Sequence, residues 1–221
     1  MFDWWRDTNE TEEEIGVLDG MLITTQSGFL SGTMVATRSG WRAVDQITVG
    51  EEVLTFDHGF QIVTDIQRNL IGDTPVDKAC SDRVIEIPTG ALGNARPVLL
   101  MPDQGILVEN EETVDVMGDP FAVVAAALLE GCGEIQMARP FGPIQVTVLA
   151  FEEDEVVYID GGLLAHCPRP RCILTDPLAT KETLYHVLSP AEALNVVSAL
   201  GDSSGSAERF LHEPGELLAA V

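Results

Sequence analysis

Side chains that could bind zinc lie close together after the middle of the sequence. His166 directly precedes Cys167, and Cys172 follows after four intervening residues. Structural zinc sites use Cys and His ligands in close pairs separated by about two to four residues, so this spacing permits a zinc ion. Nearby residues supply no second close pair, and thiols packed as small apolar side chains explain the same residues. A zinc-stabilised structural protein is therefore one alternative hypothesis.

A second possible chemistry is nucleophilic attack by a serine. Ser27 and Ser31 flank a glycine-rich turn, and His58 lies in a later one. A serine hydroxyl is a weak nucleophile unless a base lies within hydrogen-bond reach. Serine and histidine are also ordinary residues of turns. Residual self-cleavage near Gly28, with one of these serines as nucleophile and His58 as base, is a second alternative.

The charge of the chain restricts its partners. Among 221 residues, 36 are acidic and 12 are basic, which gives a formal net charge of −24. Such a charge repels phosphate backbones and anionic membrane surfaces. It favours a protein partner with a basic surface. We therefore expect no nucleic-acid binding and an association with another protein.

Short runs rich in β-branched residues predict a mostly antiparallel β-domain. Glycine-bearing turns separate the runs. An uninterrupted apolar run over 121–129, preceded by Pro120 and followed by Gly131, predicts a short buried helix. Apolar residues at helical spacing over 190–200 predict a second helix near the C-terminus. The predicted strands cover residues 34–37, 52–56, 83–87, 144–149 and 155–159.

Composition divides the chain into three parts. Residues 1–27 form an acidic arm with an aromatic tip, 28–167 a β-domain, and 168–221 a proline-containing linker and helical tail. The tip residues Phe2, Trp4 and Trp5 are candidate anchors for a partner, because interfaces use aromatic side chains to fill pockets. The chain has neither a secretory signal nor a segment of the roughly 20 apolar residues that span a bilayer. We therefore expect a cytoplasmic protein with reduced cysteines.

Three regions of the chain, 28–60, 89–108 and 150–161, resemble the bacterial branch of the Hedgehog/intein (Hint) domain family. Residues 28–33, Gly-Phe-Leu-Ser-Gly-Thr, resemble its opening Cys-Phe-x-x-Gly-Thr, and 50–59 resemble its Gly-Asp-x-Val-x-Thr-x-Asp-x-Gly. Residues 89–97 and 101–108 resemble its Ala-Gly-Ala-Leu-Gly segment and Ser-Pro-Asp-His turn. Residues 150–161 resemble its late Asp-x-His-Glu-Val-x-x-Ala-x-Gly strand. The resemblance implies a single Hint-like antiparallel β-domain over 28–167.

The resemblance also implies which positions carry the family's chemistry. In active members the opening cysteine attacks the carbonyl of the preceding peptide bond, and histidines polarise that bond and move protons. Here Gly28 occupies the cysteine position, Gln104 the histidine position of the turn, and Asp154 the histidine position of the late strand. With all three reactive groups replaced, we expect no catalysis and no cofactor.

These observations lead to one preferred functional hypothesis. The chain is interpreted as a catalytically inactive Hint-like protein that acts as a protein-binding module or an accessory subunit of a larger assembly. A bacterial membrane respiratory complex, reached through protein contacts at its periphery, is one such assembly, although no residue specifies it.

Overall fold

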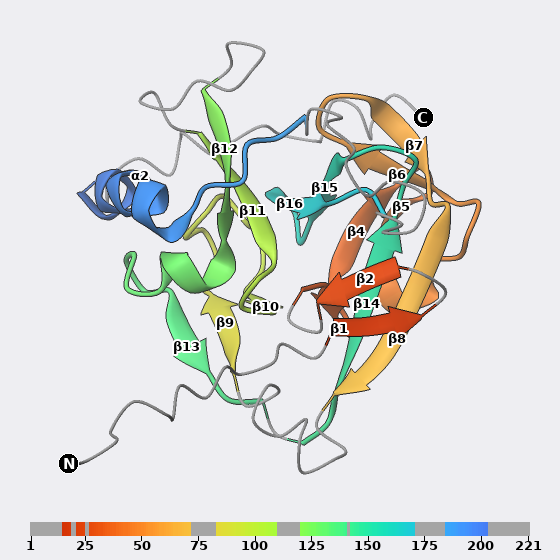
Figure 1. The fold of residues 1–221 in the computed structure, drawn as a ribbon, viewed down its shortest axis with the longest axis horizontal. Helices are drawn as coiled ribbons and strands as arrows, with labels where there is room; N and C mark the ends of the chain where they lie inside the picture. Colours follow the sequence, from red (N-terminus) through yellow and green to blue (C-terminus); the bar gives the residue numbers. More distant parts are fainter. Residues whose placement is uncertain are drawn as a thin grey trace, which may run out of the picture.

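The runs rich in β-branched residues form the strands of an antiparallel β-structure (Figure 1). The computed structural model describes residues 15–18, 21–24, 27–71, 83–109, 120–140, 142–170 and 184–202. The strands are β1 (Ile15–Leu18), β2 (Met21–Thr24), β3 (Phe29–Leu30), β4 (Met34–Thr37), β5 (Gly40–Ala43), β6 (Glu52–Thr55), β7 (Gly59–Ile62), β8 (Asp65–Ile71), β9 (Val84–Ile87), β10 (Val98–Leu100), β11 (Gly105–Glu109), β12 (Phe121–Ala125), β13 (Gln136–Ala138), β14 (Ile144–Ala150), β15 (Glu155–Ile159) and β16 (Leu163–Cys167). The described helices are the 3-10 helices η1 (Val44–Gln46) and η2 (Ala126–Leu129) and the α-helix α2 (Pro190–Asp202). This architecture confirms the predicted mostly antiparallel β fold with a helix near the C-terminus.

The strands pair into two large sheets and one hairpin. The six-stranded sheet has the order β13-β9-β10-β3-β14-β8. The eight-stranded sheet has the order β12-β11-β16-β15-β4-β6-β7, and β5 pairs with β4 beside that path. The hairpin joins β1 and β2, which fall within the part of the sequence predicted to be an arm. Long-range pairing therefore brings residues near position 30 beside residues near position 147.

The main core lies between the inner faces of the two large sheets. Side chains alternate between the two faces of a strand, so every second residue reaches this core. Phe29 and Leu100 contribute from the six-stranded sheet, and Val35, Ile106 and Val157 contribute from the eight-stranded sheet. All five are essentially inaccessible to water. Their burial holds the two sheets together.

The outer face of the eight-stranded sheet is also apolar. Near β12 and β16 it holds a cluster that includes Leu107, Val123 and Val156, against which Tyr185 packs. Toward β4 and β7 it holds Ala36, Leu54 and Tyr158, surrounded by partly buried Trp41, Phe56, Phe60 and Leu164. An antiparallel sheet that faced water on this side would carry polar residues there. The outer face of the eight-stranded sheet therefore does not have the composition of a sheet face in contact with water.

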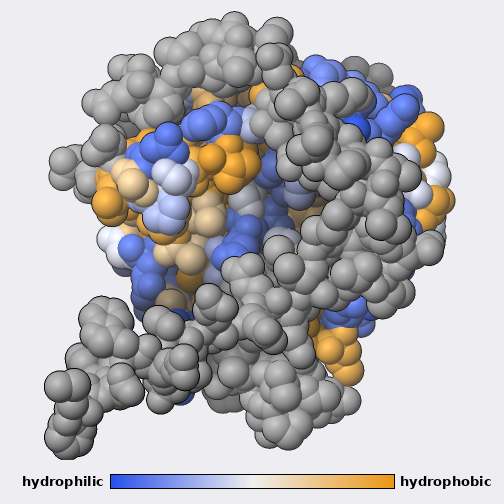
Figure 2. All heavy atoms as spheres, viewed as in Figure 1, coloured by the Kyte–Doolittle hydropathy of each residue, from blue (hydrophilic) through white to orange (hydrophobic). Residues whose placement is uncertain are grey.

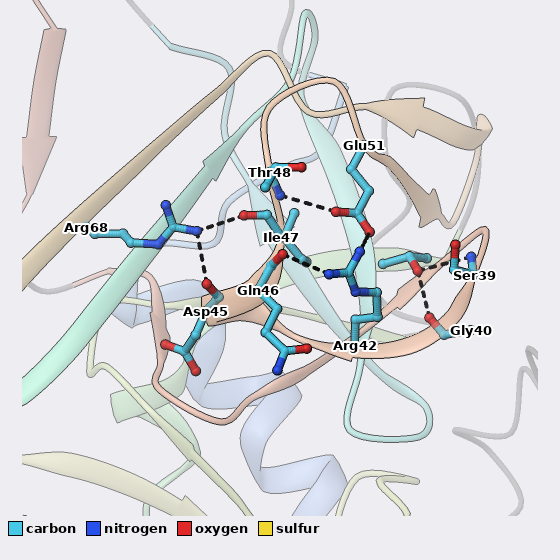
Figure 3. Close-up of polar contacts among 10 residues, drawn as sticks. Ser39, Gly40, Arg42, Asp45, Gln46, Ile47, Thr48, Glu51 and Arg68 are labelled. Atoms are coloured by element: carbon cyan, nitrogen blue, oxygen red, sulfur yellow. Dashed lines mark hydrogen bonds and ion pairs between the residues drawn. The ribbon is translucent and has the colours of Figure 1, made fainter.

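The corner after β5 is fixed by two arginines (Figure 3). The Arg42 guanidinium pairs with the Glu51 carboxylate and donates to the carbonyl oxygen of Gln46 at 3.0 Å. From β8, Arg68 donates to the carbonyl oxygen of Ile47 at 2.7 Å and to that of Asp45 at 3.3 Å. These bonds satisfy carbonyl groups that η1 leaves outside any sheet. Although η1 is short, these hydrogen bonds therefore fix the conformation of the corner.

The helix predicted over 121–129 is wrong over its first five residues. Phe121–Ala125 form strand β12, which pairs with β11 over its whole length, and only Ala126–Leu129 turn into the 3-10 helix η2. A short apolar run fits a buried strand as well as a buried helix. Val123 and Val124 suit a strand, and pairing with β11 decides the outcome.

The segment after residue 183 packs onto the β-structure. Val187 bridges Val123 in parallel, and Leu188, Ala193 and Val196 enter the main core. The Ser189 hydroxyl and the Glu192 carboxylate cap the start of α2 reciprocally. Figure 2 shows apolar residues gathered over α2 and β12. Among the described residues, no helix has both the length and the apolar character required to cross a membrane.

Candidate functional site

Gly28 lies directly before β3, and β3 pairs with β10 on one side and with β14 on the other in the six-stranded sheet. Its φ is +119°, a backbone conformation that side chains disfavour. A Cβ atom at this position would lie 2.7 Å from Val146 Cγ1, 3.0 Å from the Thr147 carbonyl oxygen and 3.1 Å from Val148 Cγ2. Both the space and the conformation required for a side chain at residue 28 are therefore missing.

Gln104 contacts Gly28 directly. The Gly28 N–H donates to Gln104 Oε1 at 3.0 Å. Gln104 Nε2 donates to the carbonyl oxygens of His166 at 2.8 Å and Gly105 at 3.0 Å. The side chain is 2% exposed, so this buried amide is held by three hydrogen bonds. An amide is neutral throughout the physiological pH range, so Gln104 orders the backbone here but transfers no proton.

Asp154 belongs to a different contact. Its Oδ1 accepts a hydrogen bond from the Arg169 backbone N–H at 2.7 Å, which ties the turn before β15 to the chain that follows β16. The structure therefore brings Gly28 and Gln104 together, and Asp154 bonds to Arg169 instead. In the neighbouring acidic run, Glu152 and Glu153 are exposed, whereas Glu155 is buried.

The candidate zinc ligands that the structure describes point to opposite faces of one strand. His166 lies on the outer face of β16, where its ring packs edge-on against Tyr185 with centroids 5.6 Å apart. Cys167 lies in the main core, and burial raises the pKa of its thiol. Cys172, and the aromatic residues Phe2, Trp4 and Trp5, lie outside the described residues. Within those described ranges no three His, Cys, Asp or Glu side chains form a group that could hold a metal ion.

The candidate serine and histidine are held in separate contacts. The Ser31 hydroxyl donates to Asp45 Oδ2 at 3.0 Å. His58 Nδ1 lies 3.1 Å from both carboxylate oxygens of Glu155. Burial raises the pKa of Glu155, although His58 opposes that rise. Ser27 adjoins Gly28 and is partly buried. The structure thus gives Ser31 a carboxylate partner and His58 a different one.

Asp160 is a buried carboxylate that sequence reasoning missed. Its N–H donates to the Met34 carbonyl oxygen at 2.8 Å, and its Oδ1 accepts from the Met34 N–H at 3.3 Å. Its carbonyl oxygen accepts from the Ala95 N–H at 3.0 Å. Asp160 has a φ of +44°, and its Oδ2 is buried without a hydrogen-bond partner. Burial raises its pKa to about 6. The only sequence signal was its place before two glycines in a turn.

Comparison with known proteins identifies the β-domain. The family model described as "Hint domain" matches residues 27–164. Similar solved structures include a splice-inactive variant of the AceL NrdHF class 3 split intein, 17% identical, covering 65% of this chain and 98% of that one with a TM-score of 0.44. A bacterial intein-like domain from Clostridium thermocellum is 14% identical over 63% of this chain and 98% of that one, with a TM-score of 0.43. No curated protein sequence matches the chain.

Proposed function

The chain belongs to the Hint domain family, and on this premise we propose that it is a catalytically inactive member that serves as a protein-binding module or accessory subunit. The observation that carries the proposal is the filled space at Gly28. Acyl transfer requires a nucleophilic side chain next to the peptide bond that is attacked. Glycine supplies none, and Val146 and Val148 occupy the place where one would lie.

The surroundings of Gly28 also support loss of chemistry. Its N–H is engaged by Gln104, whose other hydrogen bonds hold the chain at Gly105 and His166. This arrangement stabilises the peptide unit in its ground state. A catalytic site instead binds the transition state more tightly than the ground state. The contacts of Gln104 therefore suit a structural role.

A binding role is supported by the charge and by the outer face of the eight-stranded sheet. A formal net charge of −24 favours association with a basic surface and gives such an encounter long-range attraction. The aromatic residues on the outer face offer contact area of the kind that interfaces use. A larger assembly with a basic subunit surface is thus the partner that the chemistry favours.

Intact-mass spectrometry tests the loss of catalysis. The purified full chain is incubated with and without hydroxylamine, which cleaves an ester formed by attack of a serine on the preceding carbonyl. We expect the full-length mass under both conditions. Because the ester forms with the carbonyl directly before the serine, cleavage releases a fragment that begins at that serine. A fragment that begins at Ser27 and disappears in Ser27→Ala, or one that begins at Ser31 and disappears in Ser31→Ala, would overturn the proposal and establish self-cleavage. Ser31→Ala serves as the matched control for the second candidate serine.

Native co-purification tests the accessory role. A chromosomally tagged copy is isolated gently, and the accompanying chains are identified and quantified by mass spectrometry. We expect a stoichiometric partner with a basic surface that dissociates as salt is raised. The Trp4→Ala/Trp5→Ala variant tests the sequence-based expectation that the aromatic tip anchors this partner. Recovery of the chain alone under gentle conditions would contradict the accessory role.

A further inference from the structure

The β4–β7 half of the outer sheet face carries aromatic residues and has no second layer among the described residues. We define the outer aromatic face by Trp41, Phe60, Tyr158 and Ile62. Tyr158 is buried, Trp41 and Phe60 are partly buried, and Ile62 is 56% exposed. Every described member of this apolar cluster belongs to the sheet itself or to the turn after β6. On the β12–β16 half, by contrast, Leu184 and Tyr185 pack over the sheet.

Strand register places Ile62 beside this cluster. Ile62 and Phe60 are two residues apart on β7, so their side chains share one face of the sheet. Phe60 pairs with Leu54, and Ile62 pairs with Glu52 on β6. Directly opposed residues point to the same side. An exposed aliphatic side chain and a carboxylate therefore lie next to one another at the edge of the outer aromatic face.

The chain already binds one cation on this face. The guanidinium carbon of Arg38 lies 4.7 Å from the centre of the Phe60 ring. The same guanidinium donates from Nη2 to Glu52 Oε1 at 2.9 Å. An aromatic ring and a carboxylate are the two groups that hold arginine at protein interfaces. The geometry around Phe60 thus shows that this face accommodates a guanidinium beside apolar side chains.

We propose that the outer aromatic face is the docking surface for a segment of a basic partner protein that carries arginine among apolar side chains. This inference rests on the proposed binding function and names the surface that performs it. Charge decides between possible occupants. A second copy of this chain would bring another net charge of −24, and an anionic membrane would repel the chain, whereas a basic segment is attracted. Ile62 and Phe60 would contact its apolar side chains, and its arginine would share the Glu52 carboxylate with Arg38.

A peptide titration followed by NMR tests the surface on the full-length chain. The probe is a short synthetic peptide that alternates arginine with valine, and the backbone amides of the isotope-labelled chain report where it binds. Peptides that alternate glutamate with valine, or arginine with serine, are the comparison probes. We expect shifts in β5, β6 and β7 with the arginine–valine peptide, and much weaker binding of the other two.

Two matched substitutions make the outcome specific. Ile62→Lys removes the exposed apolar contact and adds a positive charge, and we expect it to weaken the peptide's affinity by about tenfold. Leu70→Lys makes the same chemical change at a side chain that is also 56% exposed, but on β8 of the other sheet, and we expect a change within about twofold. Ile62→Thr removes the same apolar contact with little loss of strand propensity and should weaken binding as well.

The results that would overturn the inference differ from those that would overturn the proposed function. Equal effects of Ile62→Lys and Leu70→Lys, shifts confined to the acidic run 152–155, or no binding of the arginine–valine peptide would each reject the outer aromatic face as a docking surface. So would cross-links in the isolated chain that show residues 203–221 covering Trp41. None of these results would affect native co-purification or the intact mass, which test the proposed function separately.

Discussion

At residue 28 both the available space and the backbone conformation restrict the residue type. We predict that Gly28→Cys lowers the free energy of unfolding by about 2–4 kcal/mol, because the new Cβ meets Val146 and the positive φ strains any side chain. Gly32→Ala is the matched control. Its φ is +87°, but no atom lies within 4 Å of its Cβ position, so only the strain of about 1–2 kcal/mol is expected. Urea denaturation measures both changes.

The same variant tests whether residue type alone can supply a reactive group at position 28. We expect Gly28→Cys, and the double variant Gly28→Cys/Gln104→His, to keep the full-length mass on incubation with a thiol. The reason is that β14 must shift before a side chain at residue 28 can take a reactive position. Cleavage before residue 28 in the double variant would show that the filled space is no barrier.

The buried carboxyl of Asp160 makes stability depend on pH. Its pKa is about 6 in the folded chain, compared with 3.8 when unperturbed. The folded state therefore favours the protonated form, and this contribution is fully present below pH 3.8 and is lost as pH rises through 6. At pH 7 the loss amounts to about 3 kcal/mol. We predict that Asp160→Asn, which tolerates the positive φ, reduces the fall in unfolding free energy between pH 4.5 and 7.5.

Urea titrations of the wild type and of Asp160→Asn at several pH values measure this difference. Asp45→Asn is a suitable comparison, because Asp45 also bonds to a backbone N–H but is less buried. Parallel pH profiles for the wild type and Asp160→Asn would exclude Asp160 as the source of the pH dependence.

At the scale of single residues, the sequence indicated where the site lies but not how it is filled. The family resemblance located Gly28 and Gln104, and the structure joins them by a hydrogen bond. The family resemblance gave no indication that Val146 and Val148 occupy the space beside Gly28, because that contact depends on the register of β14 against β3. Asp160 was missed for a similar reason: its partner Met34 lies 126 positions away in sequence.

At the scale of elements, strands with local signals were predicted well. All five predicted strands occur, as β4, β6, β9, β14 and β15, with ends that differ by no more than one residue. Their β-branched residues and glycine turns are local features. The helix predicted over 121–129 was wrong for residues 121–125, because their conformation is decided by pairing with β11. No local pattern in the sequence encodes that pairing.

The C-terminal segment is expected to contribute to the stability of the whole fold. We predict that Leu188→Ala, at a side chain that is 4% exposed in the main core, lowers the free energy of unfolding by about 2–5 kcal/mol. Val187→Ala is the adjacent control, since Val187 is 54% exposed, and a change within about 0.5 kcal/mol is expected. Equal effects of the two substitutions, measured by urea denaturation, would contradict the packing of this segment onto β12.

At the scale of the whole molecule, repulsion among like charges opposes folding. A net charge of −24 raises the free energy of the compact state more than that of the extended one. We predict that added sodium chloride raises the thermal midpoint as the Debye length falls to about 8 Å at physiological ionic strength. Potassium chloride at equal ionic strength should have the same effect if screening is the cause. A midpoint that stays constant or falls with salt would contradict this expectation.

The valines that fill the space at Gly28 also restrict evolutionary change at this position. A mutation that placed cysteine at position 28 would put its Cβ 2.7 Å from Val146 Cγ1 and lower stability before any activity could be selected. If Val146 were first replaced by a smaller residue, the change would leave a cavity at a buried position, because Val146 is only 1% exposed. Either substitution lowers stability when it occurs first, so both routes to a side chain at position 28 are opposed. Descendants of this chain are freer to diversify their surfaces than to acquire a nucleophile at position 28.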